Sequence, residues 1–194
     1  MRNLVGVATA ATLCFLPYSA VAQAITLTPA DPQPTEAELA PGLAVKYAYP
    51  GDVKSLQDAK SWLDYGTEDG EPLVGFDYPD TLEGEMALTS RQSIQVVAAI
   101  SGYIKFDAPG QYQLEFQSND GLSVEIGGEE VSRYDGRHPC EAAGFQDVEV
   151  PEAGWYELEA LYFQRVGTAC LLMQWGTADS GLDWTPNEAF AHRR

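Results

Sequence analysis

Two cysteines in the second half of the chain, Cys140 and Cys170, carry the clearest chemistry in the sequence. A third, Cys14, lies in an apolar N-terminal run that resembles a secretory signal. After removal of such a signal, an exported protein keeps an even number of cysteines, which predicts one disulfide between Cys140 and Cys170. That bond would close a loop of about 30 residues. A metal site is the weaker alternative, because two cysteines without neighbouring histidines do not complete a zinc site.

The first 22 residues predict export. Arg2 is followed by a largely apolar run over 4–16 and by the small-x-small sequence Ala20-Val21-Ala22, which reads as a cleavage site. The run is shorter than the about 20 apolar residues that a spanning helix needs, so a membrane anchor is the less favoured alternative. We therefore expect a bacterial-type signal peptide over 1–22, a periplasmic or secreted protein, and no membrane span in the mature chain.

Residues that could catalyse a reaction are sparse. The chain has two histidines, His138 and His192. It contains no Gly-x-Ser-x-Gly elbow, no Walker loop and no zinc motif. Paired carboxylates can cleave glycosides, but the 29 acidic residues are scattered and the sequence marks out no pair. The sequence thus predicts a protein that is not an enzyme.

The charge of the chain narrows the class of partner. The net charge is −18, and removal of 1–22 takes away one base and no acid. Such a charge repels nucleic acid and anionic membrane surfaces, so no nucleic-acid partner is expected. Arg133, Arg137 and His138 form a basic cluster in this acidic chain. These three side chains either pair with local carboxylates or bind an acidic sugar.

Two further features could contact a ligand. The turn Asn119-Asp120-Gly121 separates two predicted strands, and its residue types are ordinary turn formers because they tolerate left-handed backbone angles. Exposed aromatic rings can stack on sugar rings. Trp184 lies in a predicted loop and is the better platform, whereas Trp175 falls on the apolar face of a strand and is expected in the core.

Strands must position these candidates. Apolar and polar side chains alternate in short segments that glycine- and proline-containing turns separate, at 43–49, 100–106, 112–116, 122–126, 148–150, 156–162 and 171–175. This alternation predicts an all-β fold, an antiparallel sandwich or barrel. We expect one short helix within 53–64, where apolar residues fall near one face. Residues 65–93 are expected to form loops with one or two short strands, and 176–194 a loop with a frayed end.

The length is that of one domain. Residues 23–41 contain four prolines among small and acidic residues, and we expect an extended arm there. We expect a single β domain over 42–190 and a basic tail over 191–194.

The second half also resembles the PA14 domain family. The likeness starts at Gly102-Tyr103-Ile104 and runs through Ser118-Asn119-Asp120-Gly121 and Gly127-Gly128. It resumes at Gly154-Trp155-Tyr156-Glu157-Leu158 and ends at Leu171-Leu172-Met173-Gln174-Trp175. It covers about 94–176 well, and the earlier part only through its first strand. The resemblance implies a β-sandwich or barrel elaborated by loops, and an extracellular recognition module, often for carbohydrate.

The resemblance also implies a calcium site. In calcium-dependent lectins of this family, two adjacent aspartates hold a calcium ion that binds sugar hydroxyls. The corresponding pair here is Asn119-Asp120, in which Asn119 offers a carbonyl oxygen but no charge. Further ligands in those lectins come from a later loop. Asp179, Asp183 and Asn187 are available in 176–190, and nothing in the sequence singles one out.

The leading hypothesis is an exported recognition module for a glycan or another cell-envelope ligand, with calcium as the candidate cofactor. The candidate metal ligands are Asn119 and Asp120, and the candidate ligand-binding residues are Asn119, Asp120, Gly121, Arg137 and Trp184. The alternative is a structural or protein–protein interaction domain of the cell envelope that takes no small ligand and contacts an envelope protein.

Overall fold

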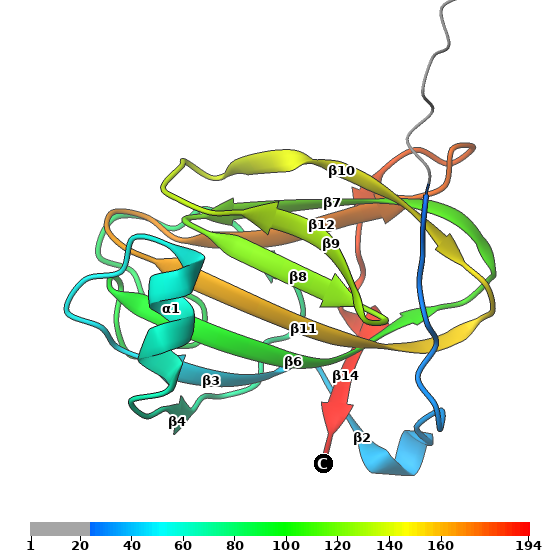
Figure 1. The fold of residues 1–194 in the computed structure, drawn as a ribbon, viewed down its shortest axis with the longest axis horizontal. Helices are drawn as coiled ribbons and strands as arrows, with labels where there is room; N and C mark the ends of the chain where they lie inside the picture. The colour runs from blue at the N-terminus through cyan, green and yellow to red at the C-terminus, as the bar shows by residue number, and fades with distance from the viewer. Residues whose placement is uncertain (1–23) are drawn as a thin grey trace, which may run out of the picture.

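A computed structural model describes residues 24–194 as two packed β-sheets (Figure 1). The expected signal peptide over 1–22 lies outside the described residues. The first sheet contains, in order, β1 (Ile25–Thr26), β10 (Glu141–Val150), β7 (Gly110–Asn119), β12 (Cys170–Gly176) and β13 (Asp183–Trp184), with β5 (Asp77–Tyr78) beside β12. All its pairs are antiparallel except β1–β10.

The second sheet is entirely antiparallel. It contains, in order, β2 (Leu39–Pro41), β14 (Phe190–Arg193), β6 (Val96–Phe106), β11 (Gly154–Gln164), β8 (Leu122–Ile126) and β9 (Glu129–Tyr134). Beside β6 lies β3 (Ala44–Ala48), and beside β3 lies β4 (Glu68–Asp69). Two short 3-10 helices span Glu36–Glu38 and Asn187–Ala189. The prediction of an antiparallel β-sandwich with one short helix is confirmed.

The main core lies between the two sheets. Successive side chains of a strand point to opposite faces, so the alternating apolar residues of each strand meet there. Phe106 of β6 meets Tyr156 of β11 edge to face, with 5.3 Å between the ring centres, and also packs on Trp175 of β12. Trp175 is half-buried against the core, as its place on the strand predicts. Fully burying one such large side chain stabilises the fold by about 1.5–3 kcal/mol.

The helix α1 (Leu56–Leu63) covers one end of the outer face of the second sheet (Figure 1). Ser55 caps its start by accepting the Asp58 N–H at 3.0 Å. Leu56 and Ala59 are buried in a second apolar cluster that includes Phe163 of β11. The amphipathic pattern that predicts a helix within 53–64 is therefore confirmed.

Both ends of the described chain join the sandwich. In the segment 24–41, expected to form an extended arm, β1 pairs with β10 and β2 pairs with β14, and Leu27 and Leu39 are buried. The expectation of a frayed end is wrong, because β14 pairs with β6 and β2. Phe190 is 1% exposed and anchors that strand in the core. One inward aromatic residue in a strand of four leaves little alternation for sequence reasoning to detect.

Cys140 and Cys170 form the predicted disulfide. The bond joins the segment just before β10 to the first residue of β12, and these two strands flank β7. A disulfide fits an exported protein, because such bonds persist in oxidising compartments. Within residues 24–194, no helix is long and apolar enough to cross a membrane.

Candidate functional site

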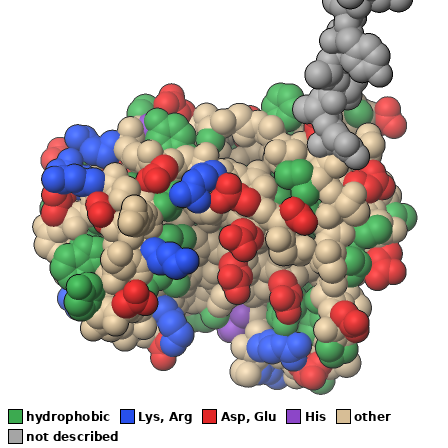
Figure 2. Space-filling model, in the orientation of Figure 1, with side chains coloured by type: hydrophobic (Ala, Val, Ile, Leu, Met, Phe, Trp, Pro, Cys, Tyr) green, Lys and Arg blue, Asp and Glu red, His purple; other side chains and the backbone are tan. Residues whose placement is uncertain are grey.

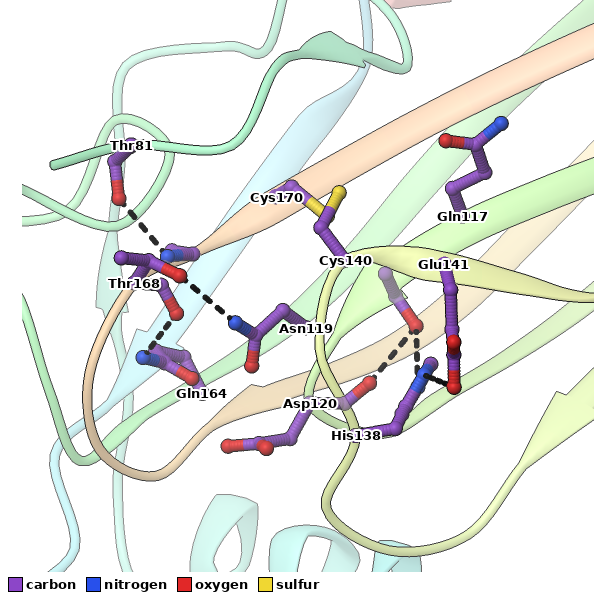
Figure 3. Close-up of a disulfide and its surroundings, with 12 residues drawn as sticks. Thr81, Gln117, Asn119, Asp120, His138, Cys140, Glu141, Gln164, Thr168 and Cys170 are labelled. Atoms are coloured by element: carbon purple, nitrogen blue, oxygen red, sulfur yellow. Dashed lines mark hydrogen bonds and ion pairs between the residues drawn. A yellow bond between two sulfur atoms is a disulfide. The ribbon is translucent and has the colours of Figure 1, made fainter.

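The Asn119–Asp120 turn lies at one end of the sandwich, where β7 passes into β8 (Figure 3). Its peptide bond is cis. Backbone bonds tie the turn to β11: the Asp120 N–H donates to Phe163 O at 3.1 Å, and the Phe163 N–H donates to Gly121 O at 3.0 Å. A Cβ atom on Gly121 would lie 2.2 Å from Phe163 Cε1, so only glycine fits this close approach. The turn is thus packed into the domain.

Asn119 is 7% exposed and is held at both its main chain and its side chain. Tyr162 donates its hydroxyl proton to Asn119 O at 2.5 Å. The side-chain nitrogen Nδ2 donates to Thr168 Oγ1 at 3.0 Å, in the loop between β11 and β12. Because that bond uses the donor end of the amide, the carbonyl oxygen Oδ1 is the end left for another partner.

Asp120 places a carboxylate in the same region, 2% exposed. Its Oδ2 accepts the Arg165 N–H at 2.8 Å. Burial raises the pKa of the Asp120 carboxyl, while the Arg165 N–H and the charge of Arg137 act in the opposite direction. A buried carboxylate is costly when it is charged, so a nearby cation would stabilise it.

Gln164 is the residue of this site that sequence reasoning missed. It is the last residue of β11, its side chain is fully buried, and Nε2 donates to Thr168 O at 2.6 Å. Its Oε1 is buried and meets no hydrogen-bond donor in residues 24–194. Leaving a buried acceptor unsatisfied costs about 1–3 kcal/mol. Figure 3 shows Gln164, Asn119, Asp120 and Thr168 grouped at this end of the sandwich, so three side-chain oxygens are available there.

The distances place Ser118, His138 and Glu141 in the order of a serine–histidine–acid relay. Ser118 Oγ is 3.3 Å from His138 Nε2, and Nδ1 of the same ring is 3.9 Å from Glu141 Oε1. The Ser118 hydroxyl, however, donates to Asp120 O at 2.8 Å, so the ring nitrogen must be the donor toward Ser118. Ser118 is also 2% exposed. This arrangement supports the turn and does not prepare a nucleophile.

The other predicted site residues lie apart from one another. Arg137 is exposed and close enough for its charge to act on Asp120. Trp184 is 52% exposed, but it pairs with Gln174 of β12, whereas Asn119 pairs with Cys170 of the same strand. The four-residue offset corresponds to about 13 Å along the strands. The structure therefore does not bring Trp184 to the turn.

The loop that contacts the turn is 165–169, through Thr168 to Asn119 and Arg165 to Asp120, and no hydrogen bond joins the described segment 176–190 to Asn119 or Asp120. Asn187 of that segment instead donates to Asp77 Oδ2 at 3.1 Å. Asp80 lies near both sulfurs of Cys140 and Cys170, but disulfide sulfurs carry no thiolate to bind a metal. The oxygens of Asn119, Asp120 and Gln164 are thus the better donor set for a hard cation.

Asp120→Asn is expected to remove part of the pH dependence of stability. Burial holds the pKa of the Asp120 carboxyl above its ordinary value of 3.8. When folding raises the pKa of a carboxyl group, the free energy of unfolding of the protein falls as the pH rises from the unfolded pKa through the folded pKa of that group. In the presence of chelator, the free energy of unfolding of the wild type should therefore fall relative to Asp120→Asn from about pH 3 to neutral pH. Urea unfolding of both proteins across this range measures it, and a constant difference would contradict the assignment.

Comparison with known proteins gives one family match. The family model described as PA14 domain matches residues 89–188, just over half of the chain. No curated protein matches the chain.

Several solved structures share the fold. One is the PA14 domain of the antifreeze protein MpAFP, with 14% identity and a TM-score of 0.69 over 84% of this chain and 96% of that one. A PA14 sugar-binding domain from an RTX adhesin has 16% identity and a TM-score of 0.62, over 78% and 98%. The Epithelial Adhesin 9 A domain from Candida glabrata, in complex with Galb1-3GlcNAc, has 14% identity and a TM-score of 0.66, over 88% and 97%. At these identities the likeness is one of fold.

Proposed function

Because the chain belongs to the PA14 domain family, we propose that it is an exported recognition module that binds a glycan beside the Asn119–Asp120 turn with the help of a calcium ion. The observation that carries the proposal is that a buried carboxylate, Asp120, and a buried oxygen with no hydrogen-bond partner in residues 24–194, Gln164 Oε1, lie at the same end of the sandwich (Figure 3). Two solved structures that share the fold are a sugar-binding domain and an adhesin domain in complex with a glycan, which supports the ligand class.

Asp120, Asn119 Oδ1 and Gln164 Oε1 are the groups that would hold the ion. All are oxygen donors, as calcium prefers, and Asp120 supplies the negative charge. A bound calcium ion supplies positive charge and coordination positions for sugar hydroxyls. Arg165 and Thr168 orient the side chains of Asp120 and Asn119 through the bonds described above. Arg137, exposed near the turn, is the candidate to contact the ligand itself.

Calcium should raise the melting temperature of the wild type, because a ligand that binds only the folded state stabilises that state. At a calcium concentration of about 100 times the dissociation constant, the free energy of unfolding should rise by about 2.7 kcal/mol. This corresponds to a rise in melting temperature of roughly 5–10 °C for a domain of this size. Asp120→Asn should abolish the rise. Asn119→Asp should enlarge it, because a second carboxylate strengthens a calcium site. Thermal melts with calcium and with chelator measure all three.

Asp179→Asn is the matched control, because Asp179 is an exposed acid outside the site. It should keep the full calcium response. A screen of the wild type against a glycan array, with calcium and with chelator, then tests the ligand class. If the melting temperature of neither the wild type nor Asn119→Asp responds to calcium, a calcium site beside the turn is excluded. If no glycan is retained in either condition, the recognition function is excluded as well.

A further inference from the structure

A groove runs across the outer face of the second sheet, beside α1 and separate from the turn. It encloses about 650 Å³, within the range of about 300–1,000 Å³ that is common for ligand sites. A smaller hollow of about 280 Å³ shares Ala44, Ser101 and Glu159 with it and continues toward β14. Figure 2 looks onto the side of the molecule that carries α1 in Figure 1.

The strand register explains the floor of the groove. One row of outward side chains, Ala48, Val97 and Phe163, is covered by α1. The next row is left open and consists of cross-strand neighbours from β3, β6, β11, β8 and β9, namely Lys46, Ala99, Leu161, Ser123 and Arg133. Its central members are small or apolar, so the floor is low and partly hydrophobic. Leu56 and Leu63 of α1 line the same groove.

The following row forms an acidic wall. Glu159 of β11 lies directly opposite Glu125 of β8, and Glu125 lies opposite Glu130 of β9. Figure 2 shows acidic side chains gathered across this face. Glu130 forms an ion pair with Arg133 at 3.0 Å, whereas Glu125 and Glu159 have no ion-pair partner in residues 24–194. Like charges directly opposite each other destabilise a sheet, so a cation bound between Glu125 and Glu159 would relieve this repulsion.

The basic side chains that line the groove do not neutralise both Glu125 and Glu159. Lys46 is paired with Asp69 at 2.7 Å, and Arg133 is paired with Glu130. Lys60 of α1 lines the groove and forms no ion pair in the described part of the chain, but it is a single charge facing two free carboxylates. Three basic and four acidic side chains line the groove, so it combines a partly hydrophobic floor with a net charge of −1.

We propose that this groove binds an extended polypeptide segment of a partner protein, whose lysine or arginine side chains reach Glu125 and Glu159. Charge complementarity selects a cationic occupant. A second copy of this chain is disfavoured, because each copy carries a net charge of −18. The groove has no aromatic residue in its lining, so it lacks the stacking surface that would suit a sugar ring. The groove and the proposed glycan site share no lining residue.

The test uses a fluorescein-labelled ten-residue peptide of alternating lysine and alanine as the probe, with fluorescence anisotropy at physiological ionic strength. The wild type should bind it and should not bind the corresponding glutamate–alanine peptide. Each exposed ion pair contributes up to about fivefold in affinity, so Glu125→Gln with Glu159→Gln should weaken binding by up to about 25-fold. Ala99→Trp should weaken binding comparably, because it fills the floor without changing the charge.

The matched control is Glu83→Gln with Glu188→Gln, which removes the same charge from exposed acids outside the groove. This variant should bind like the wild type. The proposal is overturned if the wild type does not prefer the cationic peptide, if the control loses as much affinity as the groove variant, or if Ala99→Trp binds normally. The Glu125→Gln and Glu159→Gln variant should melt no lower than the wild type, since it relieves repulsion, and it should keep the calcium response. Loss of peptide binding is then distinguishable from loss of the glycan site.

Discussion

Replacing both cysteines, Cys140→Ala with Cys170→Ala, is expected to lower the free energy of unfolding by about 3–4 kcal/mol. The two residues are 30 positions apart, and the bond between them removes conformational freedom from the unfolded chain. For a domain of this size, the loss corresponds to a fall in melting temperature of roughly 10 °C. Urea unfolding at neutral pH measures it directly. Reducing agent should lower the stability of the wild type similarly and leave the double variant unchanged.

The position of the bond links this loss to the site. Cys170 of β12 lies opposite Asn119 of β7. Glu141 of β10, the residue after Cys140, lies opposite Ser118 of β7. The disulfide therefore holds together the two strands on either side of the end of β7, just before the turn. We expect the double variant to show a weaker calcium response as well. Wild-type stability in that variant would mean that the packing of β10 and β12 on β7 is sufficient alone.

Phe163→Ala is expected to cost about 3–5 kcal/mol, the usual range for truncation of a fully buried phenylalanine. Phe163 is fully buried and packs in the cluster that attaches α1 to the sheet. Its ring also lies against Gly121, so truncation would leave a cavity under both the helix and the turn. Denaturant unfolding measures the loss of stability, and hydrogen exchange of α1 reports whether the helix detaches.

Two control variants distinguish the loss of the phenylalanine ring from the effect of truncating any apolar side chain on this face of β11. Phe163→Leu keeps much of the apolar volume and should cost less than half as much. Leu161→Ala, at the half-buried outward position two residues earlier on the same strand, should also cost less, because less apolar area is lost. If Phe163→Ala is no more costly than Leu161→Ala, the cluster beneath α1 does not hold the helix in place.

Local pattern in the sequence was sufficient for the fold class. Strict alternation in 112–116 and 156–162 predicts strands with one buried face, and both lie within long strands of the sandwich. The pair Cys140 and Cys170 allows one intramolecular disulfide, which forms. These features could be predicted because a strand or a disulfide partner is set by residue types within a short segment or by a simple count.

The pairing between distant segments was decided by the tertiary structure alone. Gln164 reads as an ordinary polar residue at the end of a strand, and only the pairing of the turn with β11 places it beside Asp120. The acidic wall is similar, because Glu125 and Glu159 become neighbours only through the register of β8 and β11. A shift of that register by one residue would move one of these carboxylates to the other face of the sheet. Residue types determine which groups are available, but the register of strands far apart in the chain determines which groups meet.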